Sequence, residues 1–141
     1  MAGPFTLTDA LIIINGVTLS DHANQVTITD SREEKDATAF GATSKSSLKG
    51  LGEASMDIVL FQDYSAGKTH ATISPLISSN TTVAVEVRAT SAARSVTNPA
   101  HLLATALMFD YKPLDASVGD VPTTTCTFKN SGNTGMTYPT S

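Results

Sequence analysis

The sequence has little of the chemistry that most functional sites require. Its 141 residues include one cysteine and no tryptophan, and only 16% are charged, against about a quarter in an ordinary soluble domain. The single cysteine, Cys126, excludes an intrachain disulfide and any zinc site built from several cysteines. The absence of tryptophan and the 6% aromatic content count against a domain that binds sugars by stacking.

Basic residues and long apolar runs are also scarce. Nine Lys and Arg against thirteen Asp and Glu give a formal net charge of −4, which disfavours a protein that binds nucleic acid by neutralising phosphates. The longest apolar stretch, 102–109, is interrupted by Thr105 and is far too short to span a membrane. The first ten residues contain Asp9 and no basic cluster, so no secretory signal is predicted. The length fits a single domain over 1–141.

Strand and turn patterns occupy most of the chain. Asn15-Gly16 lies between two apolar runs and predicts a tight hairpin turn. Alternating apolar residues predict strands around 26–29, 54–61, 82–90, 101–111 and 123–128. Ser65 is a candidate cap for one helix that ends near Ile77, although Pro75 weakens this pattern. We therefore predict a mainly β, antiparallel fold with about one helix.

The segment 30–52 differs from its surroundings, because it holds eight of the chain's 22 charged residues and shows no sustained period. We predict a long loop arm here. It is open whether the arm is a solvated, disordered insert or orders on a neighbouring subunit, where mixed charges would set the register between copies. The candidate contact residues are Arg32, Glu33, Glu34, Lys35, Asp36, Phe40, Lys45, Leu48 and Lys49. The segment 130–141 is small and polar and is predicted to be a flexible C-terminal tail.

No residue pattern predicts an enzyme, a metal site or a cofactor. Asp21 and His22 are sequence neighbours on a turn and cannot supply the separate groups of a catalytic triad, so His22 is expected to make turn hydrogen bonds. His70 and His101 lie in unrelated segments without metal-ligand spacing and are expected to be structural or surface residues. Cys126 alternates with threonines in a strand and is expected to be a small buried hydrophobe. Glu86 and Arg88 share one face of their strand, which suits solvent or an interface.

Six segments carry a family resemblance. They are IINGVTLSDH at 13–22, TAFG at 38–41, FQDYSAG at 61–67, VAVEVRATSA at 83–92, NP at 98–99 and YKPLDASVGD at 111–120. Together and in this order, they resemble the major tail tube proteins of long-tailed, siphovirus-type bacteriophages, especially those of actinobacterial hosts.

The resemblance implies both a fold and a function. The fold would be an antiparallel β-sandwich or partly closed barrel flanked by one α-helix over 65–77, with the arm 30–52 reaching an adjacent ring or subunit. The function would be that of a structural virion protein whose hexameric rings stack into the tail tube, the conduit for DNA ejection. The implied partners are other copies of the chain, a tape measure protein in the lumen, and tail terminator and tail-tip proteins. DNA would pass without specific binding, no membrane would be involved, and the virion tail would be assembled in the host cytoplasm.

Two alternatives to this function stay open. One is a monomeric β-sandwich that serves as a binding or decoration module, and the other is the tube protein of a contractile injection machine, which would share the fold. A ring of six copies would carry 6 × −4 = −24 formal charges. Because acidic groups repel phosphate, we expect the lumen of such a tube to be net negative.

Overall fold

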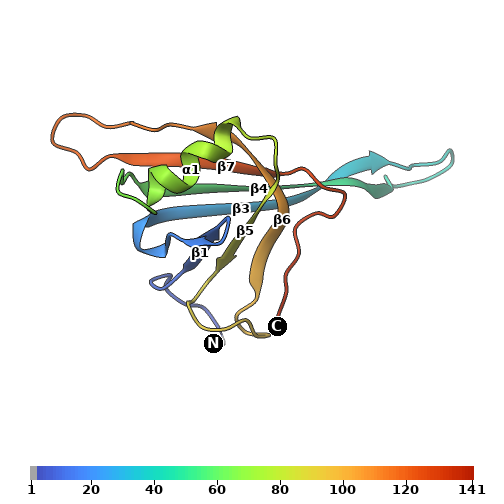
Figure 1. Cartoon of the computed structure of the whole chain (residues 1–141). Coiled ribbons are helices and arrows are strands. Elements are labelled where there is room, and N and C mark those ends of the chain that lie inside the picture. Colours follow the sequence, from blue (N-terminus) through green and yellow to red (C-terminus); the bar gives the residue numbers. More distant parts are fainter. Residues whose placement is uncertain (1–2) are drawn as a thin grey trace.

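The computed structural model describes residues 3–141 and forms one antiparallel, seven-stranded sheet (Figure 1). The elements in chain order are β1 (Leu11–Ile14), β2 (Val17–Thr18), the 3₁₀ helix η1 (Ser20–His22), β3 (Ala23–Asp36), β4 (Ser47–Phe61), α1 (Thr69–Ser78), β5 (Val83–Arg88), β6 (Ala100–Tyr111) and β7 (Thr123–Asn130). The strand order across the sheet is β2-β1-β5-β6-β7-β4-β3. The predicted mainly β, sandwich-like fold with one α-helix is confirmed over the described residues. That helix, α1, has ten residues and is too short to cross a membrane.

A single hydrophobic core lies between the curled sheet and α1, which packs against β6. Every second residue of the central strands points into it, because side chains alternate between the two faces of a strand. Met56, Ile58 and Leu60 of β4 are fully buried, as are Cys126 and Phe128 of β7. The alternation predicted for these two strands is therefore confirmed.

The turn predicted at Asn15-Gly16 is confirmed. Asn15 has φ 51° and Gly16 has φ 81°, so both residues adopt the left-handed conformation that a two-residue hairpin turn requires. Ile13 pairs with Thr18 and Ile14 pairs with Val17 across this turn. β2 is short, and it forms one edge of the sheet.

The arm is present, but it is a β-hairpin and not the long loop predicted over 30–52. β3 and β4 stay paired far beyond the core, with Arg32 opposite Gly52 and Lys35 opposite Leu48, so that only 37–46 is a loop. Figure 1 shows this hairpin as the cyan projection on one side of the molecule. Opposite charges two residues apart share a face of the strand and form the exposed ion pairs Arg32–Asp30 and Lys35–Glu33 along it. Charge rather than apolar alternation marks these strands, which is why the apolar pattern did not reveal them.

The helix begins later than predicted. Lys68 precedes α1 and makes no side-chain cap, and Pro75 lies inside the helix. Ser65, the predicted cap, belongs to a turn instead: its N–H donates to Asp63 Oδ1 at 2.9 Å, and its carbonyl accepts from Lys68 N at 3.2 Å. An Asx-type turn thus competes with helix initiation at this point.

The segment 131–141 lies along β6, unlike the flexible tail predicted from its composition. Leu102 and Thr137 exchange two backbone hydrogen bonds, both 3.0 Å long, and Met136 is only 6% exposed. β7 pairs with β6 from Ala106 onward, so the first residues of β6 would otherwise leave backbone groups without a strand partner. The C-terminal segment supplies hydrogen-bond partners for these groups, as buried backbone N–H and C=O groups require.

Candidate assembly surfaces

His22 has two carboxylate partners, one on each ring nitrogen. His22 Nδ1 lies 2.8 Å from Asp21 Oδ1, and His22 Nε2 lies 2.8 Å from Asp63 Oδ2. Ionised carboxylates only accept hydrogen bonds, so the two contacts favour the protonated imidazole, in which both ring nitrogens donate. The hydrogen bonds to Asp21 and Asp63 raise the pKa of His22. The Ser65 N–H, with help from His22, lowers the pKa of Asp63 to about 2. This clamp ties η1 to the β4–α1 connection and confirms the turn role predicted for His22.

The predictions for Cys126 and Glu86 had different outcomes. Cys126 is fully buried, and burial raises the pKa of its thiol to about 12, so it is the inert hydrophobe that was predicted. Glu86, predicted to face solvent or an interface, is only 7% exposed. It accepts hydrogen bonds from Arg94 and from Arg88 Nε, the latter at 2.5 Å. The hydrogen bond from Arg94 lowers the pKa of Glu86, and this effect outweighs burial, which acts in the opposite direction.

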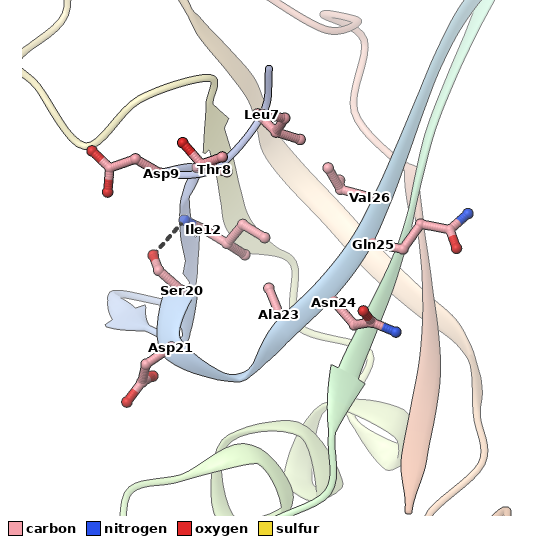
Figure 2. Close-up of a pocket in the computed structure, with 11 residues that line it drawn as sticks. Leu7, Thr8, Asp9, Ile12, Ser20, Asp21, Ala23, Asn24, Gln25 and Val26 are labelled. Atoms are coloured by element: carbon pink, nitrogen blue, oxygen red, sulfur yellow. Dashed lines mark hydrogen bonds between the residues drawn. The ribbon is translucent and has the colours of Figure 1, made fainter. Parts of the chain in front are cut away.

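A groove of about 370 Å³ separates the two ends of the curled sheet. Figure 2 shows it between the segment that precedes β1, with Leu7 and Asp9, and the start of β3, with Ala23 and Val26. The Ile12 N–H donates to Ser20 Oγ at 2.9 Å and so joins β1 to η1 at its edge. No group of three potential metal ligands occurs anywhere in residues 3–141. The groove is the seam of a partly closed barrel.

The solvent-facing side of β3, β4 and β7, together with Asp110 of β6, forms a polar surface, here called the outer sheet face. Its side chains align in rows across the three strands: Gln25, Val59 and Thr125; Thr27, Asp57 and Thr127; Thr29, Ser55 and Lys129. Short hydroxyl side chains predominate. Glu53 and Asp110 extend these rows, so the face carries three acids, counting Asp57, against the single base Lys129, a net charge of −2.

Two strand edges of the same layer have no strand partner within the described residues. β3 is the last strand of the sheet, and its outer edge is unpaired along all 14 residues. β5 pairs with β6 only as far as Ala106, so the stretch Leu107–Tyr111 pairs with β7 on one side alone. Unpaired edges are templates for pairing with another chain.

The nine predicted contact residues all lie on the hairpin arm or at its tip. The arm's first charges are paired along its own strand: Arg32 Nη1 lies 2.6 Å from Asp30 Oδ1, and Lys35 Nζ lies 2.6 Å from Glu33 Oε1. The Glu34 carboxylate accepts from Ser47 Oγ, and the Asp36 carboxylate accepts from Thr38 N, both at 2.9 Å. Lys45 and Lys49 take part in no ion pair among the described residues.

The apolar side chains of the arm have no core to enter. Phe40 is 109% exposed, at the tip, and Leu48 is 63% exposed. Leu51 is exposed as well and was missed, although its position among glycines and charges in the sequence could have identified it. At the root of the arm, Tyr138 Oη donates to Asp30 Oδ2 at 2.5 Å, so the C-terminal segment holds the root.

A second projection, the β6–β7 loop at 112–122, extends from the side of the molecule opposite to the arm (Figure 1). Leu114, Val118 and Val121 are exposed on it. Its base is held in place, because Tyr64 Oη donates to Pro113 O at 2.8 Å and His70 Nδ1 lies 2.9 Å from Tyr111 Oη. Sequence reasoning did not single out this loop as a contact surface.

The fold is shared with chains of tail-like particles. A chain in the virion of a native gene transfer agent particle has a TM-score of 0.70 at 11% identity, over 93% of this chain and 95% of that one. A chain in the extended sheath–tube complex of the extracellular contractile injection system PVC has a TM-score of 0.68 at 9% identity, over 98% and 93%. A chain in the baseplate of the anti-feeding prophage has a TM-score of 0.66 at 14% identity, over 99% and 97%.

These likenesses establish the fold, over almost the whole of both chains. No family model matches the sequence, and no curated protein matches it. The structural neighbours are parts of virions and injection particles rather than enzymes.

Proposed function

We propose that this chain is a tail tube protein that self-assembles into stacked hexameric rings and forms a conduit for DNA. The observation that carries the proposal is the fold shared, end to end, with chains of tail-like particles. One such match is a chain from a gene transfer agent tail with C6 symmetry, with a TM-score of 0.63 at 9% identity over 84% of this chain and 82% of that one. The two unpaired strand edges and the exposed arm support self-association.

Within a ring, the edge of β3 in one copy joins the free edge of β6 at 107–111 in the next. The layer β6-β7-β4-β3 then continues from subunit to subunit, and the free edge of β6 and the facing part of the β3 edge are covered once the ring closes. This geometry explains why a 14-residue edge strand is exposed in the isolated chain. It also uses the same layer that presents the outer sheet face.

The outer sheet face lines the lumen in this assembly. Threonines and serines cover most of this face, and Lys129 is its one cationic side chain. Its net charge of −2 repels phosphate. A weakly acidic, hydroxyl-covered wall therefore lets DNA pass without being held. A solved tube with Lys and Arg along the channel would contradict this assignment.

Between rings, the arm is the contact element and carries the nine predicted contact residues. The further partners are a tape measure protein in the lumen and terminator and tip proteins at the two ends of the tube. The tail belongs to the virion and is assembled in the host cytoplasm. A siphovirus-type tail of an actinobacterial host is the interpretation favoured by the sequence resemblance. The match to a contractile sheath–tube complex makes a contractile injection machine the second candidate.

Negative-stain microscopy of concentrated, purified protein tests the proposal, with hollow rods or rings as the expected result. Replacing Arg32 to Lys49 by a short glycine turn should leave a folded monomer, as judged by circular dichroism, but abolish rods. The Val96→Ala variant is a matched control at an exposed site away from these surfaces and should form rods. A strictly monomeric 14.7 kDa species at every concentration, or normal rods from the deletion, would count against the proposal.

A further inference from the structure

We infer that the tip of the arm binds the β6–β7 loop of a second copy, in a head-to-tail contact between successive rings. This inference rests on the proposed function, and it adds the receiving surface, which neither the resemblance nor the comparisons specify. The contact joins Phe40, Lys45 and Lys49 of one copy to Asp115, Val118 and Asp120 of the next.

The two surfaces lie at opposite ends of the molecule. Figure 1 shows the arm and the β6–β7 loop extending in opposite directions, roughly along the strands of β4 and β7. They cannot meet within one chain, whereas a copy placed beyond the arm presents its β6–β7 loop to it. A contact between two different surfaces is heterologous, and when its geometry does not close into a ring it can repeat without limit, as a growing stack requires.

Each surface exposes apolar side chains that the chain's own core does not cover. Phe40 is at the tip of the arm, and Leu48 and Leu51 follow on β4; on the other surface, Val118 is 106% exposed, and Leu114 and Val121 flank it. Several exposed apolar side chains on one projection are typical of an interaction site. Burying both sets against each other removes them from water together.

The unpaired charges of the two surfaces are complementary. The other charged groups of the arm have partners within the hairpin, which leaves Lys45 and Lys49 free there. Asp115 and Asp120 on the β6–β7 loop likewise form no ion pair in residues 3–141, and neither does Lys112 beside them. Two cations thus face a loop with a net charge of −1, an arrangement that sets orientation and partner choice.

Both projections are held in place before binding. Tyr138 and Arg32 hold Asp30 at the root of the arm. Gln62 and Tyr64 hold the carbonyl of Pro113 at the base of the loop. Preorganised segments lose less conformational entropy when they bind, which favours a specific contact.

Site-specific cross-linking tests the contact directly, since the native Cys126 is buried and leaves introduced cysteines as the only reactive thiols. Phe40→Cys protein, isotope-labelled, is mixed with unlabelled Val118→Cys protein, assembled and treated with a short bis-maleimide. We expect mixed dimers of one labelled and one unlabelled chain, and no cross-linked dimers from either variant alone. Replacing Val118→Cys by Val96→Cys, which is also exposed, should abolish the product.

A charge exchange provides the second test. The Lys45→Glu, Lys49→Glu double variant should fold but lose rod formation, and adding Asp115→Lys and Asp120→Lys should restore it. Dimers from Phe40→Cys alone, or rods without the mixed product, would overturn this inference while leaving the tube function intact. If the unmodified protein forms no rods or rings under any condition, the proposed function fails and the inference fails with it.

Discussion

The two halves of β4 show how differently one strand can be stabilised. In its second half, Met56, Ile58 and Leu60 are fully buried in the core. In its first half, from Ser47 to Glu53, nearly every side chain is exposed, and the strand is held by the ladder to β3 and by the hydrogen bond that Ser47 Oγ donates to Glu34. A two-stranded ribbon without a hydrophobic face is marginally stable in water. The body of the molecule is therefore built to fold alone, and the arm is built to be covered.

Removing one large aromatic side chain from the body and one from the arm should give the largest difference between these two regions. Phe128→Ala empties the centre of the core, where Phe128 is fully buried, and should lower the free energy of unfolding by about 3–5 kcal/mol. Phe40→Ala at the arm tip should change it by less than about 0.5 kcal/mol and yet weaken rod formation. Urea denaturation and electron microscopy measure the two effects. A large loss of monomer stability from Phe40→Ala would break the comparison.

Two glycines sharpen the comparison at a smaller scale. A Cβ on Gly132 would overlap Thr105, whose Oγ1 also lies 3.2 Å from Asn130 Oδ1, so Gly132→Ala should cost about 1–3 kcal/mol of unfolding free energy. A Cβ on Gly52 would come within 2.7 Å of Arg32 Nη1, the far end of an exposed and flexible side chain. Gly52→Ala should therefore cost under about 0.5 kcal/mol. Gly135→Ala, with open space around it, is the control for thermal denaturation.

The junction of arm and body should show an intermediate effect. Tyr138→Phe removes the hydroxyl that donates to Asp30 at the root of the arm, and a hydrogen bond of this kind contributes about 0.5–1.5 kcal/mol. Its loss should speed hydrogen exchange in the arm at 30–36 more than in the core strands. Uniform exchange changes throughout the chain would show that the tyrosine supports the body instead.

The smallest effect should depend on pH. Because the folded-state pKa of His22 is raised above 6.5, its stabilising contribution is complete at pH below 6.5 and is lost as pH rises through the folded pKa. The His22→Asn variant should therefore have a lower free energy of unfolding than the unmodified protein below pH 6.5, and this difference should shrink as the pH rises above neutrality. Asp63, with a pKa of about 2, stays ionised throughout that range. Val96→Ala is the control and should show no pH-dependent difference, because the exposed Val96 carries no titratable group.

Apolar periodicity predicted the body of the molecule well. The strand around Met56 and Ile58, the strand that contains Cys126, and the turn at Asn15-Gly16 all follow from local patterns. These patterns reflect burial on one face or a local backbone requirement, and both can be read from neighbouring residues.

The remaining features depend on partners that are distant in the sequence. The C-terminal segment is ordered by Leu102, which pairs with Thr137, and composition contains no sign of such a pairing. The late start of α1 depends on the Asp63 turn. For the candidate site, mixed charge marked the arm residues, but the exposure of Val118 and the opposed placement of the two projections require the folded chain.

The paired strands of the arm also determine a length. From Asp30 to Asp36, β3 advances six residues beyond the region of the core, which corresponds to about 20 Å at the usual rise of a strand. The spacing between successive rings would then be measured by backbone geometry rather than by side chains. Inserting two residues into each strand would lengthen the arm by about 7 Å and keep its faces, whereas inserting one would turn every side chain of the extension to the opposite face.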